Sequence, residues 1–318
     1  MSLQLPAVDV PPQPWTGRFD GDGPGHRRWW QAVNAGRGPG PGEAAGRKPA
    51  ALLGFASDEG VRRNKGRTGA SAAPAALRKA LGPLAFHLDR RVADLGDVVV
   101  SGQDLEAGQE RLGQAVAALL DAGHQTVVLG GGHETAYASY LGVSASSPVR
   151  NGQRLGVLNL DAHFDLRDEP VPSSGTPFLQ MARAEADAGR EFRYAVVGIS
   201  EPNNTRVLFD TARKLGVRYL LDEDCAADRV RDFVAAFLAD IDVLYLTIDL
   251  DVLPAAVAPG VSAPAAYGVP LPVISAACRQ VAQSGKLLHL DVAELNPAFD
   301  VDGRTARTAA RLVDTLLR

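Results

Sequence analysis

The sequence predicts one three-layer α/β domain, in which helices cover both faces of a parallel β-sheet. From residue 50 onward, short and almost continuously apolar runs alternate with amphipathic stretches. This alternation is typical of parallel strands and their crossover helices. Polar residues directly follow several of the apolar runs, as expected where strands end at a ligand-binding edge. With 46% apolar and 22% charged residues, the chain can bury a large core.

Six apolar runs have the length and composition of buried strands. They are ALLGFA (51–56), TVVLG (126–130), RLGVLNL (154–160), YAVVGIS (194–200), VLYLTID (243–249) and LLHLDVAEL (287–295). Two stretches between them predict helices. Residues 104–123 place Leu112, Val116 and Leu119 near one helical face, and residues 272–285 begin with Pro and end with Gly.

The chain changes composition once. Residues 1–49 are rich in Gly, Pro and Arg, end in GRGPGPGEAAGRKP (36–49), and predict a wandering or partly disordered N-terminal arm. Trp15, Trp29 and Trp30 indicate that part of this arm docks on the main body. Residues 50–318 are predicted to form a single domain.

Charge and composition exclude several classes of partner. The net charge is −4 and the arginines are scattered, so neither nucleic acid nor an anionic membrane is expected. No apolar run approaches the roughly 20 residues of a membrane span, and the amino terminus lacks the features of a secretory signal. Cys225 and Cys278 are far apart, which favours reduced, buried thiols in a cytoplasmic protein. The oligomeric state stays open, a homo-oligomer included.

Potential metal ligands gather where three of the predicted strands end. TVVLG continues into GGHE, RLGVLNL into DAHFD, and VLYLTI into DLD. Residues two apart on an extended chain point the same way, so these side chains converge if the chain stays roughly extended there. The candidate ligands are His133, Asp161, His163, Asp165, Asp249 and Asp251.

Two histidines and four aspartates predict a site for two metal ions. So many carboxylates are costly to collect without cations, and carboxylates with a few imidazoles suit Mn²⁺ or a similar ion. Two ions about 3.5–4 Å apart can lower the pKa of a shared water and produce hydroxide at neutral pH. A single Asp at a strand end is more often a cap or turn former, and the glycines before His133 could instead shape a turn. The three motifs together favour the metal site. His289 lies inside a predicted strand and is interpreted as a core imidazole.

Five motifs resemble the successive signatures of the arginase–agmatinase–formimidoylglutamase (ureohydrolase) family, in the family's order and over about residues 50–318. They are GGGHE (130–134), NLDAHFD (159–165), SSGTPF (173–178), LTIDLDVLPAAVAPGVSAPA (246–265) and DVAELNP (291–297). The resemblance implies an arginase-like domain with about eight parallel strands and two Mn²⁺ ions.

The resemblance also assigns the ligands. One ion would be bound by His133, Asp161, Asp165 and Asp249. The other would be bound by Asp161, His163, Asp249 and Asp251, with Asp161 and Asp249 bridging.

Local sequence favours the formimidoylglutamase subgroup. Gly132 stands where arginases and agmatinases usually carry Asp, and DEGVRRNKGRTGA (58–70) also resembles that subgroup. The implied reaction is hydrolysis of N-formimidoyl-L-glutamate to L-glutamate and formamide, a step of histidine degradation, by attack of metal-bound hydroxide on the amidine carbon. One departure is Ser174, which replaces a His that shuttles protons in arginases.

The implied chemistry gives roles to further residues. Glu294 resembles the family's acidic clamp and would pair with the cationic amidine; the alternative is a helix-start residue. Asp251 or Asp165 could pass a proton to the leaving amine. The two carboxylates of the glutamyl tail call for cations or hydroxyls at the entrance. The candidates are Arg167, Ser173, Ser174, Asn204 and Arg63, each of which could instead be a solvated or turn residue.

Two alternatives remain at this stage. Asp168 and Glu169 in the DLRDEP segment are compatible with a cationic substrate tail, as in an agmatinase or another guanidino hydrolase. A non-catalytic metal-binding homologue is disfavoured because all six ligands and Glu294 are present.

Overall fold

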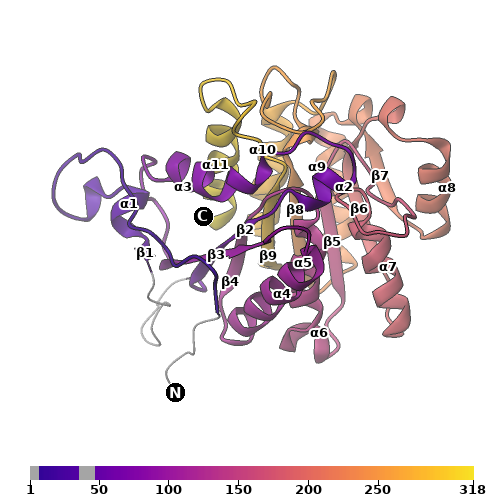
Figure 1. The fold of residues 1–318 in the computed structure, drawn as a ribbon, viewed down its shortest axis with the longest axis horizontal. Coiled ribbons are helices and arrows are strands. Elements are labelled where there is room, and N and C mark those ends of the chain that lie inside the picture. The colour runs from indigo at the N-terminus through magenta and orange to yellow at the C-terminus, as the bar shows by residue number, and fades with distance from the viewer. Residues whose placement is uncertain (1–6, 36–46) are drawn as a thin grey trace.

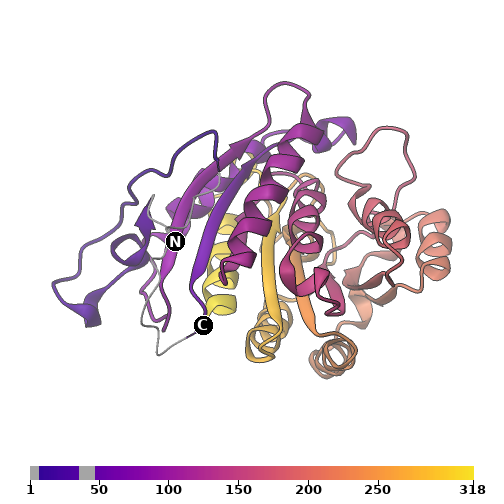
Figure 2. The same ribbon diagram turned by 90° about the horizontal axis from the view of Figure 1, so that it is seen from below.

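A computed structural model describes residues 7–35 and 47–318, which form one nine-stranded sheet with helices on both faces (Figures 1 and 2). All the paired strands are parallel, in the order β1-β3-β2-β4-β9-β8-β5-β6-β7. The strands are β1 Asn34–Ala35, β2 Ala50–Ala56, β3 Val92–Val99, β4 Gln125–Leu129, β5 Leu155–Leu160, β6 Arg193–Ile199, β7 Arg218–Leu221, β8 Val243–Asp249 and β9 Leu287–Ala293.

The helices divide between the two faces of the sheet. They are α1 Trp29–Ala32, α2 Glu59–Arg63, α3 Ala73–Leu81, α4 Leu105–Asp121, α5 Thr135–Ser144, α6 Ser147–Arg150, α7 Pro177–Asp187, α8 Arg206–Lys214, α9 Ala227–Ala239, α10 Leu271–Gln283 and α11 Arg304–Leu317. The apolar faces of α3, α9, α10 and α11 pack into one core cluster, and those of α4, α5, α7 and α8 pack into another.

The alternation of side chains along the strands produces these two cores. In β2, Ala50 and Leu52 face one cluster, whereas Ala51, Leu53 and Phe55 face the other. Both faces are buried, so the strand is apolar throughout, which is why the central strands were recognisable from sequence.

The predicted three-layer fold is confirmed, and the six predicted strands correspond to β2, β4, β5, β6, β8 and β9. The sheet has nine strands, close to the eight or so that the family resemblance implied. The three strands beyond the six predicted runs are β1, β3 and β7. β1 has two exposed residues, β7 has four at the sheet's edge, and β3 contains Asp94, Gly96 and Asp97, so none reads as an apolar run.

The described part of the N-terminal arm contacts the domain through its tryptophans. Trp29 is fully buried and its Nε1 donates to Asp314 at 3.0 Å. Trp15 Nε1 donates to Asp94 Oδ2 at 2.8 Å. Most of the GRGPGPGEAAGRKP segment, residues 36–46, lies outside the described residues.

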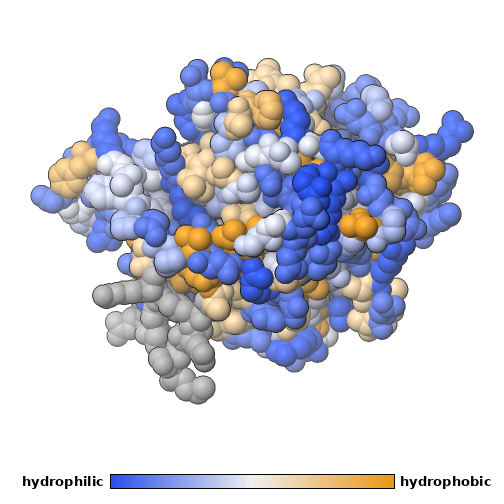
Figure 3. Space-filling view, in the orientation of Figure 1, coloured by the Kyte–Doolittle hydropathy of each residue, from blue (hydrophilic) through white to orange (hydrophobic). Residues whose placement is uncertain are grey.

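The surface and the thiols agree with the composition. The face seen in Figure 3 is largely hydrophilic, with apolar residues in small, separated patches. Cys225 and Cys278 are buried and unpaired, as predicted. Among the helices that the structure describes, none is long and apolar enough to span a membrane.

Candidate metal centre

Four neighbouring strands deliver the candidate ligands to one edge of the sheet. In the order β4-β9-β8-β5, the chain after β4 carries His133, the chain after β9 carries Glu294, β8 ends at Asp249, and Asp161 follows β5. Because all four strands are parallel, their carboxyl ends lie together. Residues separated by more than 100 positions therefore meet in one place.

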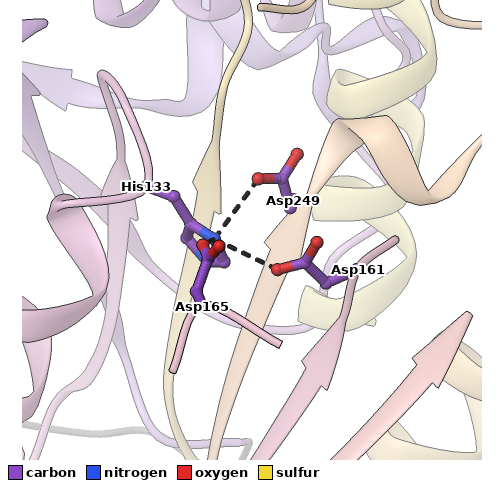
Figure 4. Close-up of side chains that lie close together, drawn as sticks. All are labelled: His133, Asp161, Asp165 and Asp249. Atoms are coloured by element: carbon purple, nitrogen blue, oxygen red, sulfur yellow. Dashed lines mark hydrogen bonds and ion pairs between the residues drawn. The ribbon is translucent and has the colours of Figure 1, made fainter. Parts of the chain in front are cut away.

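The first cluster surrounds the imidazole of His133 (Figure 4). Its Nδ1 lies 2.9 Å from Asp165 Oδ2 and 3.2 Å from both Asp161 Oδ2 and Asp249 Oδ2. The four ligand atoms are within 4.8 Å of one another, and three of the four residues are fully buried. One nitrogen and three carboxylate oxygens thus converge on a single point, as predicted for the ligands of the first ion.

The second cluster shares Asp161 with the first. His163 Nδ1 lies 3.0 Å from Asp251 Oδ2 and 3.5 Å from Asp161 Oδ1. Asp161 therefore presents one oxygen to each cluster. Asp249 belongs to the first cluster, and its Oδ1 accepts a hydrogen bond of 2.8 Å from the backbone N–H of Asp251. This arrangement is compatible with bridging by Asp161, and the bridging roles of Asp161 and Asp249 both stay predictions.

The electrostatics of the first cluster fit a bound cation. Burial, followed by Asp251 and Asp161, raises the pKa of Asp249 well above its ordinary value. Burial alone would lower the pKa of His133, but the hydrogen-bonded Asp161 and Asp165 raise it well above the ordinary value. Without a metal, these buried carboxylates repel one another and compete for protons. A divalent ion bound between the carboxylates and the imidazole would remove that repulsion. The residues present therefore fit a binuclear manganese site.

Thr247 orients the His133 ring and was not predicted from the sequence. His133 Nε2 lies 3.1 Å from Thr247 Oγ1, on the side of the ring away from the carboxylates. If Nε2 carries the proton and donates to Thr247, Nδ1 keeps its lone pair for a metal. The available signal was spacing, because Thr247 precedes Asp249 by two residues on β8 and faces the same side.

The backbone does not stay extended where the ligands converge, which corrects the predicted local geometry. β5 ends at Leu160, and Asp165 reaches the cluster with a left-handed φ of 48°. Asp251 lies in a 3-10 turn, Leu250–Val252, rather than continuing β8. Turns bring alternate carboxylates closer than a straight strand would, and a non-glycine residue with such a φ costs about 1–3 kcal/mol.

Glu294 lies beside the first cluster with half of its carboxylate uncommitted. Its Oε1 accepts a hydrogen bond of 2.8 Å from the backbone N–H of His133, and its buried Oε2 has no partner among the described residues. Burial, with a further contribution from Glu134, raises the pKa of Glu294 to about 8. Its φ of 68° is also left-handed. The chain holds this acid in a costly conformation and leaves one oxygen free.

The glycines before His133 allow close packing of the β2–α2 loop. A Cβ on Gly131 would lie 1.8 Å from the carbonyl oxygen of Ser57, and one on Gly132 would lie 2.2 Å from Glu134 Oε2. Glu134 Oε1 in turn accepts from the Ser57 hydroxyl at 2.7 Å and from the backbone N–H of Gly60 at 3.0 Å. Glu134 therefore holds this loop against the centre.

The candidate substrate residues differ in how free they are. Arg167 is exposed, and its guanidinium makes no hydrogen bond or ion pair with the described residues. Ser174 is buried and its Oγ accepts from Asn64 Nδ2 at 3.1 Å. The buried Ser173 donates to Glu169 Oε2 at 3.1 Å. Arg167 is thus the candidate with unused donors.

Arg63 and Asn204 are engaged with the protein itself. Arg63 pairs with Glu59 and Glu106 and donates to the carbonyls of Gln103 and Pro172. These contacts occupy all of its N–H groups, so they account for Arg63 as a brace between loops. Asn204 is buried; its Oδ1 accepts from Phe164 N–H, and its Nδ2 donates to the carbonyls of Ala162 and Ser200. It holds the DAHFD turn in shape.

His289 on β9 was predicted to be a core residue rather than a metal ligand. His289 is fully buried, and its Nδ1 lies 2.7 Å from Thr126 Oγ1. It lies within the strand and belongs to neither ligand cluster. The prediction of a core imidazole is confirmed.

The parallel sheet and the His/Asp clusters define a metal-dependent hydrolase of the binuclear class. Residues 48–318 match the model of the arginase family, and the chain belongs to that family. Similar proteins include the formimidoylglutamase of Nocardia farcinica (strain IFM 10152), 60% identical over 305 residues that cover 95% of each chain. Another is the formimidoylglutamase of Rhodococcus opacus (strain B4), 57% identical over 312 residues, 97% of this chain and 96% of the relative.

A solved structure of similar shape is that of Trypanosoma cruzi formiminoglutamase with Mn²⁺. It is 26% identical in sequence, has a TM-score of 0.74, and the match covers 85% of this chain and 92% of that one. The arginase-like fold expected from the sequence motifs is therefore confirmed.

Proposed function

We propose that the two His/Asp clusters form the catalytic centre at which the chain hydrolyses N-formimidoyl-L-glutamate to L-glutamate and formamide. The observation that carries the proposal is the convergence of three carboxylate oxygens on His133 Nδ1 within 3.2 Å, beside a second His/Asp cluster. The similarity to formimidoylglutamases over almost the full length supports the substrate. The reaction is one of the steps by which histidine is degraded.

Two Mn²⁺ ions, when bound, supply Lewis acidity that lowers the pKa of water and so provides a nucleophile at neutral pH. The proposed ligands are the six histidines and aspartates of the two clusters: His133, Asp161, His163, Asp165, Asp249 and Asp251. Thr247 fixes the ring of His133, and Asn204 fixes the turn that carries His163 and Asp165. The protein thereby sets the positions of the ligands before an ion arrives.

Glu294 is proposed to bind the cationic amidine. Its free Oε2 is the acceptor, while the His133 backbone N–H holds Oε1 in place. A buried carboxylate that gains a cationic partner is strongly stabilised in its charged form. The substrate would therefore be held by a charge-assisted hydrogen bond with its reacting carbon over the clusters.

Proton transfer to the departing glutamate amine is proposed for Asp165 or Asp251. Both carboxylates have a raised pKa, for which burial is the largest cause. Ser174 accepts from Asn64 and offers a hydroxyl rather than an imidazole, so it is proposed as a substrate contact. Ser173, close to it in the same loop, shares that role.

Arg167 is proposed to bind a carboxylate of the glutamyl tail. Its exposed guanidinium has no partner among the described residues, and an arginine fork matches a planar carboxylate. The nearby acids that could have suited a cationic tail are already engaged. Asp168 pairs with Arg183 at 2.8 Å and Glu169 accepts from Ser173. This favours an anionic tail over that of agmatine.

The remaining features are proposed from composition and from the family match. The division into an arm (1–49) and one catalytic domain (50–318) is supported by a family match that begins at residue 48. Action without nucleic acid is proposed from the net charge of −4, and a cytoplasmic location is proposed from the free, buried cysteines. Sedimentation measurements would establish whether the chain is a homo-oligomer.

A substrate panel tests the function. The purified chain with Mn²⁺ is assayed on formimidoyl-glutamate, agmatine, arginine and guanidinobutyrate. We expect turnover of formimidoyl-glutamate with a kcat/KM well above that of the guanidino compounds, and loss of activity after chelation that added Mn²⁺ restores. Preference for agmatine would overturn the substrate assignment, and full activity after exhaustive chelation would overturn the metal mechanism.

A further inference from the structure

A cavity with several basic residues lies at the amino-terminal edge of the sheet, opposite the metal centre. It has a volume of about 330 Å³ and is lined by Arg47, Lys48, Arg90 and Gln125 with parts of β9, α10 and α11. This volume is within the range of small-ligand sites. An adjoining cavity of 250 Å³ shares Arg47 and adds three arginines. These are Arg279, Arg311 and Arg318.

The charges around this cavity are unbalanced. No acidic residue of the described chain lines either cavity, although the protein as a whole has a net charge of −4. Arg47 and Lys48 make no ion pair with the described residues. Asp314, which lines neither cavity, pairs with Arg318 at 2.8 Å and with Arg311 at 3.9 Å, so it offsets part of the charge of the adjoining cavity. The cations nearest to Gln125 have no counter-ion among the residues that the structure describes.

Gln125 provides a second, independent indication of a ligand. It is 6% exposed, and its Oε1 accepts a hydrogen bond from Arg90. This bond fixes the amide, because the reversed orientation would place two donors together. Gln125 Nε2 is then left without a partner, and so is Arg90 Nε. Burial and the neighbouring Arg47 lower the pKa of Arg90 to about 10. An acceptor with negative charge would satisfy all of these groups.

We propose that the cavity formed by Arg47, Lys48, Arg90 and Gln125 binds a small oxyanion of the phosphate class. A tetrahedral oxyanion can accept from several converging donors at once, and arginine, lysine and amide N–H groups are its usual partners. Free phosphate and a phosphomonoester share this chemistry. The adjoining cavity with its further arginines would accommodate the rest of a larger ligand.

The site is separate from the metal centre. Gln125 begins β4, whereas His133 follows its carboxyl end. Four steps along the strand at about 3.3 Å each place Gln125 roughly 13 Å from Leu129, and His133 lies beyond that end. None of the four lining residues contacts a proposed metal ligand. The proposal therefore stands or falls independently of the proposed reaction.

Binding to the manganese-loaded chain tests the proposal. Equilibrium dialysis at constant ionic strength, set with potassium chloride, measures inorganic phosphate in one arm and adenosine 5′-monophosphate in the other. Arg47→Ala removes an exposed cation, and Gln125→Met removes the buried donor while keeping its size. Arg213→Ala, which removes an exposed arginine on α8, is the matched control. Hydrolysis is assayed in parallel and should be unchanged in all three variants.

We expect saturable binding of one anion per chain at this site, weakened at least tenfold by Arg47→Ala and by Gln125→Met but not by Arg213→Ala. Tighter binding of the nucleotide than of phosphate would assign the site to phosphomonoesters, and the reverse order would assign it to the free ion. Absence of saturable binding overturns the proposal. So does equal weakening by the control, which would indicate general charge attraction, or equal affinity in wild type and Arg47→Ala.

Discussion

The two edges of the sheet are electrostatic opposites. At the carboxyl edge, two His/Asp clusters and Glu294 bring acids together in a buried space. At the amino edge, arginines and a lysine line cavities into which no described acid projects. β4 connects the two, beginning at Gln125 and leading to His133.

The comparison shows how the fold supports both kinds of charge concentration. Between the edges, the strands contribute two apolar cores that do not depend on either set of charges. The domain can therefore keep like charges close together at its ends, although neither arrangement is favourable alone. The acidic edge is buried and needs cations, whereas the basic edge combines the exposed Arg47 and Lys48 with the partly buried Arg90 and the buried Gln125. The effects of substitutions at the two edges should accordingly differ in magnitude.

The largest effect is expected for Asp249→Asn. Loss of a ligand carboxylate should reduce the manganese content below two ions per chain. It should also lower kcat/KM by more than the roughly 10–100-fold that is typical for loss of a residue that only hydrogen-bonds to a metal ligand. Metal analysis and steady-state kinetics measure this. Asp242→Asn is the matched control, because Asp242 precedes the same strand at its other end and pairs with Arg154. Two ions and normal activity in Asp249→Asn would refute the ligand assignment.

The same substitution should act in the opposite direction on the metal-free protein. The pKa of Asp249 is raised in the fold, so its ionised form costs stability above the ordinary carboxyl range. The metal-free wild type should therefore lose stability as the pH rises from about 4 to 7, and Asp249→Asn should be the more stable of the two at pH 7. Thermal unfolding after chelation checks this sign. If metal-free Asp249→Asn is less stable than the metal-free wild type, repulsion between the buried carboxylates does not destabilise the fold.

Glu294→Gln should have the next largest effect. The glutamine keeps the shape and can still accept from His133 N–H, but it loses the charge that faces the amidinium. Loss of one charge-assisted contact should lower kcat/KM by about 10²–10³ while the manganese content stays at two. An unchanged rate would show that Glu294 has a structural role.

Thr247→Val should affect metal affinity more than chemistry. Valine has nearly the same shape but cannot accept from His133 Nε2, so the ring loses its fixed orientation. The expected loss in manganese affinity is about 10–100-fold, with kcat near normal at saturating Mn²⁺. Thr247→Ser keeps a hydroxyl and is the control. If both variants bind manganese like the wild type, Thr247 does not position the ligand.

The smallest effect is expected for Arg167→Ala. The substitution should raise KM for formimidoyl-glutamate about tenfold or more and leave kcat largely unchanged. This corresponds to the roughly 1.5–3 kcal/mol of a hydrogen bond to a charged group. The KM of Arg167→Lys should lie between those of the wild type and Arg167→Ala, because lysine keeps the charge but not the two-pronged guanidinium geometry. Arg183→Ala, in which the lost arginine pairs with Asp168, serves as the control. Unaltered KM in Arg167→Ala would remove this loop from the substrate assignment.

The sequence predicted what depends on local pattern and missed what depends on distant partners. Central strands are apolar on both faces and were recognised, and the ligands after them could be grouped because parallel strands end together. β3 was missed because its Asp94 and Asp97 look polar; in the fold, both pair with Arg78 on α3. Likewise, nothing local distinguishes the occupied guanidinium of Arg63 from the free one of Arg167.

The left-handed backbone at Glu294 sets a limit on how far this protein can be stabilised. Glycine adopts such a φ without strain, so Glu294→Gly would relieve a cost on the order of 1 kcal/mol in the native backbone. The same change would delete the proposed clamp. Asp165, with a φ of 48°, poses the same conflict between backbone and side chain. At these two positions, the residue that relieves the backbone would remove an acid to which the proposed reaction gives a role, so stability and the proposed activity make opposing demands.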